Sequence, residues 1–479
     1  MGELILNNET QLEVCPSELF ALFGSGDSSL GWLFGAEAPQ LRPGSLVRLA
    51  LPLGGLVRSP GTARVLSFQP GRRIDLMHET PWAGRVVCRF DPLSDGGTRL
   101  RVRITIDDGE VARLGAELGL LSNYGTGLRE ASLGLLTSLS GSAGILGRST
   151  VNCAQLAVEE INADGGVMGR TVRLVVADDS TDPGIGAIAM RRLCRTPGLA
   201  AVVGMHSSAT YAVTAPMAVA EGIPYLYTPT SEPTAAHPLL VRFGETPMDQ
   251  LHQALPRMAA QTGGSRWFLA GNDYSWPRAI GATARAVIER MGGTVAGEGY
   301  LPRGSQDFEP VLKAIQRSGV DHVVSSFVGQ DHVCFQRDFA SYGLRESIRT
   351  FAPLMDDAVV EHLGESGTGT WNVLGYFVGL DTSENRDFLC RYSERFGSCS
   401  PPVSAAAEGV YEAIHTWARS CRAGGGADPT ALLSGLRRAD FRGPRRCDRG
   451  GRLKSLLLGE ATASGVQVLD ELPAAHQAS

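Results

Sequence analysis

The chain has 479 residues, of which 43% are hydrophobic and 20% are charged, a balance typical of globular proteins that bury a core. At about 150 residues per domain, this length predicts roughly two to four domains. The formal net charge is −6, and no dense run of lysine and arginine occurs, which argues against a nucleic-acid partner. No apolar run reaches the ~18 residues that a membrane-spanning helix needs.

The N-terminal stretch MGELILNNETQLEVCP has neither a basic start nor a long apolar core before small residues, so it does not read as an export signal. Nine cysteines are scattered along the chain, without Cys-x-x-Cys pairs or the spacing of a metal site. These features predict reduced thiols, no metal, no cofactor and a cytoplasmic location. Export by a signal that is not visible here is the alternative.

The first part of the chain, residues 1–120, contains short alternating patterns separated by turn residues, which predict an antiparallel sheet. The expected strands are residues 3–14, 45–52, 61–67, 72–78, 84–90 and 98–105, and the expected helices are residues 16–23 and 107–118. This order resembles the START/polyketide-cyclase (SRPBCC) helix-grip fold. The resemblance is carried locally by Val14-Cys15-Pro16-Ser17-Glu18-Leu19-Phe20 and Gly31-Trp32-Leu33.

Residues 121–130 are polar and contain glycine, which predicts a linker. From 131 to 472, expected strands alternate with helices that end near glycine, so parallel sheets covered by helices are expected. The strands are 132–137, 171–177, 200–203, 225–227, 266–270, 294–300, 322–326 and 350–353. The helices are 149–163, 210–221, 248–262, 277–291, 308–318, 331–342, 401–421 and 429–439. One sheet cannot hold so many strands, and two lobes with a cleft between them fit best.

The segment 132–183 begins with an apolar strand that ends in small hydroxyl residues. A helix follows and ends at Gly-Gly, and a second apolar strand then ends in acidic and hydroxyl residues. This order resembles the opening of the type I periplasmic-binding-protein fold. The likeness is to the branch of amide, urea and branched-chain amino acid receptors, which includes the negative regulator of aliphatic amidase. The resemblance implies a protein that closes two lobes on a small polar ligand.

Ligands bind beyond the carboxyl ends of parallel strands, so the loops that follow the strands hold the candidate residues. Ser138 follows the first strand, and the loop 204–210 contains His206, Ser207, Ser208 and Thr210. The free amides of a helix start can hold a carboxylate or carbonyl oxygen, and the resemblance implies that use here. Ordinary helix capping by Ser208 is the alternative.

Two further loops carry aromatic residues. The segment 225–232, with Tyr227 and Thr228, resembles the family's Tyr-Pro-x-x-Tyr-Glu-Gly segment, and 271–278 resembles Gly-Ser-Asp-Tyr-x-Tyr-Pro-Arg of the amide and urea receptors. The resemblance implies that Tyr274 closes over the ligand and that Tyr227 and Trp276 shield it. A core tyrosine and a lid that makes no ligand contact are the alternatives. Val328, after a later strand, is expected to line the second lobe.

Asp356 and Asp357 follow the strand 350–353, where a carboxylate can accept bonds from a ligand ammonium or amide. Helix capping by Asp356 is an equal alternative. No Gly-x-Ser-x-Gly, His-Glu-x-x-His or P-loop motif occurs, so no catalytic residues and no enzyme activity are expected.

Together these features predict a cytosolic sensor that closes on a short amide, urea or amino acid and signals to a protein partner. The substrate-binding component of an ABC transporter is the first alternative. An enzyme or carrier acting through the START-like domain is the second. A homo-oligomer is left open.

Overall fold

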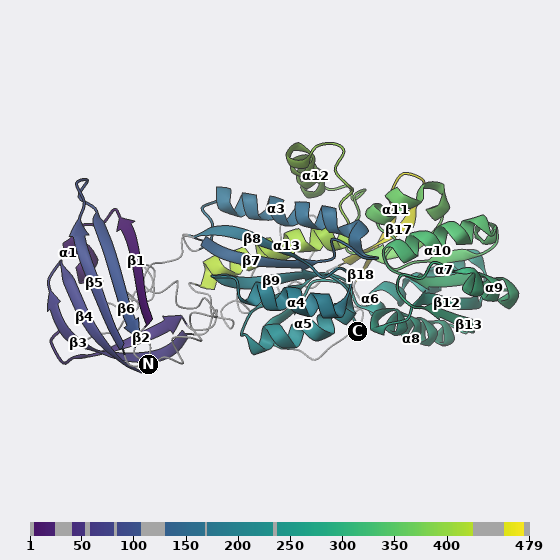
Figure 1. Cartoon of the computed structure of the whole chain (residues 1–479). Coiled ribbons are helices and arrows are strands. Elements are labelled where there is room, and N and C mark those ends of the chain that lie inside the picture. Colours follow the sequence, from purple (N-terminus) through teal and green to yellow (C-terminus); the bar gives the residue numbers. More distant parts are fainter. Residues whose placement is uncertain are drawn as a thin grey trace. The chain divides into compact units, whose positions relative to one another are not determined.

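The computed structural model describes residues 4–23, 41–52, 58–80, 84–106, 130–167, 170–232, 237–424 and 455–473. The chain forms two compact units: one is built around an N-terminal sheet and the other around two further sheets (Figure 1). The predicted linker 121–130 falls almost wholly, and the predicted helix 107–118 entirely, outside the described residues, so both stay predictions.

The N-terminal unit is an antiparallel sheet of six strands in the order β1-β6-β5-β4-β3-β2. The strands are β1 (Leu4–Leu12), β2 (Leu46–Pro52), β3 (Arg58–Gln69), β4 (Arg73–Thr80), β5 (Gly84–Pro92) and β6 (Thr98–Ile106). Because side chains alternate along a strand, one face buries residues such as Val86, Cys88 and Phe90. Helix α1 (Pro16–Ala21) packs against this core through Leu19.

The first lobe of the larger unit has a five-stranded sheet in the order β11-β10-β9-β7-β8. Its strands are β7 (Glu130–Thr137), β8 (Thr171–Asp178), β9 (Leu199–Met205), β10 (Tyr225–Tyr227) and β11 (Leu240–Arg242). Its helices are α3 (Gly147–Ala163), α4 (Pro183–Cys194), α5 (Ser208–Ala220), α12 (Ser383–Phe396) and α13 (Ala405–Gly424). Both α12 and α13 pack on α3, so the chain returns to this lobe after it has built the second one (Figure 1).

The second lobe has a seven-stranded sheet in the order β13-β12-β14-β15-β16-β17-β18. Its strands are β12 (Arg266–Asn272), β13 (Thr294–Leu301), β14 (His322–Ser326), β15 (Arg349–Phe351), β16 (Trp371–Leu374), β17 (Ser455–Ala461) and β18 (Val466–Pro473). The strands from β13 to β16 pair in parallel, and the last two pairings are antiparallel.

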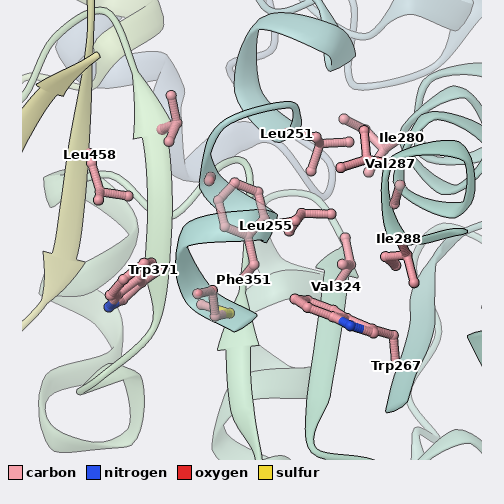
Figure 2. Packing of buried hydrophobic residues seen from close by; sticks show 14 of the residues in the cluster. Leu251, Leu255, Trp267, Ile280, Val287, Ile288, Val324, Phe351, Trp371 and Leu458 are labelled. Atoms are coloured by element: carbon pink, nitrogen blue, oxygen red, sulfur yellow. The ribbon is translucent and has the colours of Figure 1, made fainter. Parts of the chain in front are cut away.

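The helices of the second lobe are α6 (Pro247–Leu251), α7 (Ala254–Thr262), α8 (Ser275–Arg290), α9 (Glu309–Ser318), α10 (Gln330–Ser341) and α11 (Asp357–Leu363). Trp267 of β12, Leu255 of α7 and Ile280 of α8 meet in a buried core with Phe351 and Leu458 (Figure 2). This core joins strands that are distant in sequence, because β17 follows α13 and still completes this sheet.

The predicted two-lobed α/β fold is confirmed, with differences of detail. The predicted helix 248–262 is two helices, α6 and α7, and the predicted helix 401–421 begins at Ala405. Strands β11 and β16 to β18 and helices α4, α11 and α12 were not predicted. Helix α12 buries only Asn385, Phe388 and Tyr392 of its 14 residues, so its apolar stripe is too thin to stand out. The predicted helix 429–439 lies outside the described residues.

Candidate functional site

The N-terminus of α5 meets the second lobe. Ser207 Oγ accepts the Thr210 amide at 3.3 Å, so Ser207, and not Ser208, caps this helix. Ser208 is left to face the other lobe, where its hydroxyl lies 3.1 Å from Ser275 Oγ at the start of α8. The Arg303 guanidinium, from the loop after β13, donates to Ser207 Oγ at 3.2 Å.

A third contact between the lobes lies at the start of α10. The Gln330 amide donates to the Ser142 carbonyl at 2.7 Å, next to Gly329, which has a φ of +59°. These hydrogen bonds join loops of the first lobe, and the start of α5, to the second lobe at three places.

Tyr274 lies beside this meeting point, directly before α8 in extended conformation. The Arg303 guanidinium lies 5.1 Å from the centre of its ring, within cation–π range. Burial raises the pKa of Tyr274; Arg303 opposes this rise, and Glu232 and Asp331 add to it. The phenol is therefore neutral, and its hydroxyl makes no hydrogen bond with a residue that the structure describes.

Asp331, on the first turn of α10, lies close to Arg303. Its Oδ2 accepts Asn272 Nδ2 at 2.6 Å and the Gly304 amide at 2.8 Å. Burial raises the pKa of this carboxyl, while the two hydrogen bonds and the Arg303 charge oppose the rise. The second lobe therefore presents one cation and one carboxylate at the same place.

Glu232, after β10 in the first lobe, adds a second carboxylate. Its Oε2 is buried and has no hydrogen-bond partner within the described part of the chain. The charge of Glu232 also contributes to the raised pKa of Tyr227 and Tyr274, which places it near both rings. A buried carboxylate oxygen without a partner is costly, so this atom needs a donor from a ligand or from water.

Ser138 and Thr210 use their hydroxyls inside the first lobe. Asp179, which is fully buried, accepts Ser138 Oγ at 2.6 Å, the Thr181 amide at 2.9 Å and Thr210 Oγ1 at 2.8 Å. These bonds tie the loops after β7, β8 and β9 together. Asp179 thus positions the α5 start, while Ser138 and Thr210 are not free to donate to a ligand in this arrangement.

His206 and Tyr227 form part of a buried aromatic cluster. The Tyr227 hydroxyl donates to the His206 carbonyl at 2.7 Å, and the His206 ring contacts Ser207 O through Nδ1 and Tyr225 Oη through Nε2. Burial lowers the pKa of His206, and the nearby Asp179 charge opposes this. Thr228 Oγ1 reaches the Gly204 carbonyl at 3.4 Å. These residues shape the loops around Ser207 through backbone contacts.

The model of one family, described as periplasmic binding protein, matches residues 130–455. This match spans both lobes and more than half of the chain. The chain belongs to the periplasmic binding protein family.

Similar proteins support the same assignment. A Leu/Ile/Val-binding protein homolog 6 of Brucella melitensis is 24% identical over 293 residues, covering 59% of this chain and 75% of the relative. A periplasmic binding protein of Burkholderia mallei has a TM-score of 0.66 at 21% identity, covering 72% of this chain and 95% of that one. A solute-binding protein of R. palustris in complex with 4-hydroxybenzoate has a TM-score of 0.64 at 20% identity, with 72% and 97% covered.

Two of the predicted site residues, Trp276 and Val328, pack at the core of the second lobe. Trp276 is 2% exposed and belongs to the buried core of the second lobe, and its role as a shield of the ligand stays a prediction. Val328 is half-buried against the same core, and its amide donates to Asn272 Oδ1 at 2.9 Å. Asn272 thus links Val328 to Asp331.

The predicted ligand acceptors Asp356 and Asp357 are structural. Asp356 caps α11 through the Val359 amide at 3.2 Å and accepts the Ala405 amide at the start of α13 at 3.0 Å. Asp357 accepts the Val378 and Val466 amides, both at 2.9 Å. Both oxygens of each carboxylate therefore accept backbone amides in this structure, and a role for these residues as ligand acceptors stays a prediction.

Arg303, Asp331 and Glu232 were not among the predicted site residues. Arg303 and Asp331 follow strands whose loops the carboxyl-end rule would have selected, and Glu232 lies in the segment 225–232 that was singled out. An open pocket of about 480 Å³ lies elsewhere, between α12 and residues 397–403, and includes none of these side chains.

Within the described residues, no group of three or more His, Cys, Asp or Glu could hold a metal ion. None of the described helices is both long and apolar enough to span a membrane.

Proposed function

We propose that this chain is the substrate-binding component of a transport system and takes an α-amino acid between its two lobes. The observation that carries the proposal is the juxtaposition of Arg303 with two carboxylates, Asp331 and Glu232, where the lobes meet. One cation and a buried, unpartnered carboxylate oxygen match the two ends of a zwitterion.

The carboxylate end fits the first-lobe side of the site. Ser207, Ser208 and the free amides at the start of α5 are donors, and Arg303 supplies the positive charge. The ammonium end fits Glu232, whose buried oxygen lacks a donor, with Asp331 as the second acidic group. The rings of Tyr274 and Tyr227 lie beside these charges and would exclude water.

Closure of the lobes supplies the mechanism. Contacts from both lobes converge on one place, so a ligand bound there stabilises the arrangement in which the lobes touch. Opening breaks the Arg303–Ser207 and Ser208–Ser275 contacts, and the ligand can then enter and leave. Transport components use this difference to present loaded protein to a membrane permease.

The ligand class is consistent with the relatives, whose names include Leu/Ile/Val binding. The experiment is isothermal titration of the purified full chain with L-leucine, L-isoleucine, L-valine, 4-hydroxybenzoate, acetamide and urea. We expect at least one amino acid to bind, and Glu232→Gln to weaken it by about 10- to 100-fold, the worth of a hydrogen bond to a charged group. Glu346→Gln, at an exposed position of the second lobe, is the control for the loss of one carboxylate charge.

An aromatic carboxylate is the second candidate. It is favoured by the unpartnered Tyr274 hydroxyl and by the relative in complex with 4-hydroxybenzoate. Binding of 4-hydroxybenzoate that is insensitive to Glu232→Gln would replace the first candidate with this one. Binding of acetamide or urea alone, with no charged ligand, would contradict both.

The transport function favours export over the cytosolic sensor expected from the N-terminal sequence. Fractionation of the native host tests this, and recovery only in the cytosol would restore the sensor and its protein partner.

The strand order β1-β6-β5-β4-β3-β2 with α1 after β1 supports the proposal that residues 1–120 form a helix-grip domain, separate from residues 131–472.

A further inference from the structure

The face of the N-terminal sheet opposite its core carries an unusual charge pattern. The alternation along β5, with Val86, Cys88 and Phe90 buried, turns Arg85 and Arg89 outward. The strand register places further arginines on this same face. We call this face, opposite the core of the N-terminal sheet, the outer face. Its arginines are Arg48, Arg64, Arg73, Arg85, Arg89, Arg99, Arg101 and Arg103.

The acidic residues with described side chains on the outer face are Glu9, Asp75 and Asp91. The described side chains of this face therefore carry an excess of five positive charges, in a chain whose net charge is −6. Asp75 pairs with Arg73 and Arg85, Asp91 with Arg101, and Glu9 with Arg99. Arg48, Arg89 and Arg103 make no ion pair or side-chain hydrogen bond with the described residues.

The register sets like charges against each other. Arg89 lies directly opposite Arg73 on β4 and opposite Arg101 on β6. Like charges in directly opposite positions destabilise a sheet, so this row costs folding free energy in the isolated protein. An anionic surface laid on the face would relieve that repulsion.

The outer face also exposes apolar side chains. Leu46, Arg64 and Met77 form one cross-strand row, and Leu66 lies in the bulge of β3. Leu46, Leu66 and Met77 are 40%, 38% and 47% exposed. Aromatic residues, on which the bases of single-stranded nucleic acid stack, are missing from the outward positions described.

We infer that the outer face of the N-terminal sheet binds the surface of an anionic lipid bilayer. Its six strands span about 24 Å, at about 4.8 Å between neighbours, which suits an extended array of phosphate headgroups better than one small anion. The arginines reach the lipid phosphates, and Leu46, Leu66 and Met77 enter the boundary with the acyl chains. This surface would hold the ligand-binding lobes near a membrane, whatever their ligand.

The experiment is co-sedimentation of the full chain with phosphatidylcholine vesicles, with and without phosphatidylglycerol, at low and high salt. We expect binding only to the phosphatidylglycerol vesicles, and weaker binding at high salt. Replacing Arg48, Arg89 and Arg103 together by Gln should reduce the partition coefficient about 100-fold, since each basic residue near such a surface is worth roughly fivefold. These changes leave no described acidic residue without its partner.

The matched control replaces three exposed arginines of the other unit, Arg191, Arg192 and Arg317, by Gln, which changes the net charge equally. An equal loss in this control would overturn the inference, as would equal binding to neutral vesicles or no binding at low salt. Leu46→Ser, Leu66→Ser and Met77→Ser together should weaken vesicle binding as well. Two results together would assign the face to nucleic acid instead. Oligonucleotides would displace the protein from the vesicles, and the triple serine variant would bind these oligonucleotides as tightly as the parent chain does.

Discussion

Replacing Gly329 by alanine should hold the lobes apart. Gly329 has φ +59° and ψ −127°, and a Cβ added there would lie 2.1 Å from the Ser142 carbonyl oxygen of the first lobe. Ordinary van der Waals contact begins at 3.4 Å, so the two loops must separate by about 1.3 Å. That displacement breaks the hydrogen bond from the Gln330 amide to Ser142 and strains the neighbouring contacts between the lobes.

The expected cost follows from these contacts. One hydrogen bond is worth about 0.5–1.5 kcal/mol, so losing the Gln330–Ser142 bond and weakening Arg303–Ser207 and Ser208–Ser275 destabilises the closed arrangement by roughly 2 kcal/mol. A ligand that needs closure should then bind about 30-fold more weakly, since 1.36 kcal/mol corresponds to a factor of ten. Isothermal titration with the tightest ligand of the panel measures this change.

Gly364 offers a matched control, because its backbone angles of 53° and −131° resemble those of Gly329 and nothing lies within 4 Å of its added Cβ. Gly364→Ala carries the same backbone strain without the contact between lobes. A second readout is disulfide trapping: Ser208 Oγ and Ser275 Oγ lie 3.1 Å apart, so cysteines at both positions should form a bond when the lobes close. If Gly329→Ala matches Gly364→Ala in affinity and trapping rate, the reasoning is wrong.

Two further predictions concern residues that the structure assigns to stability. Burial raises the pKa of Asp356 to about 7, so the carboxyl stays protonated in the folded chain while the unfolded chain ionises near pH 4. The free energy of unfolding should therefore fall by up to ~4 kcal/mol as the pH rises from about 4 to about 7. Chemical denaturation measures this pH dependence, which the Asp356→Asn variant should lack. The same pH dependence in the variant and the parent chain would contradict the assignment. Trp276→Ala should cost about 3–5 kcal/mol of unfolding free energy and leave ligand affinity unchanged, whereas Tyr274→Phe should lower affinity by about 0.5–1.5 kcal/mol with little loss of stability. The reverse pattern in thermal melts and titrations would restore Trp276 as the shield of the ligand.

The amino-acid pattern alone determined most of the secondary structure. The strands 225–227 and 322–326 agree with their observed bounds, because these short runs are rich in aromatic or β-branched residues, which favour strands. The switch from antiparallel to alternating α/β patterns likewise predicted the two-lobed fold. Helix α12 was not predicted, because only three of its residues are buried and the sequence therefore shows little helical periodicity.

The site was less predictable, because a side chain's partner is not visible in its neighbours along the chain. Asp356 resembles a free acceptor in the sequence until α13 places the Ala405 amide against it, 49 residues further on. Trp276 resembles a lid residue until the core of the second lobe encloses it. Ser207 and Arg303, 96 residues apart, meet because the two lobes touch.

Sequence periodicity thus decided which residues face inward in the N-terminal strands such as β5, because apolar and polar side chains alternate there along the chain. Only the tertiary structure decided which carboxylates accept hydrogen bonds from backbone amides and which do not. These partners come from segments that are distant in the sequence and meet where the chain passes between the lobes. The same holds for the outer face of the N-terminal sheet. Its arginines are spread from Arg48 to Arg103, and strand pairing alone assembles them into one positively charged surface.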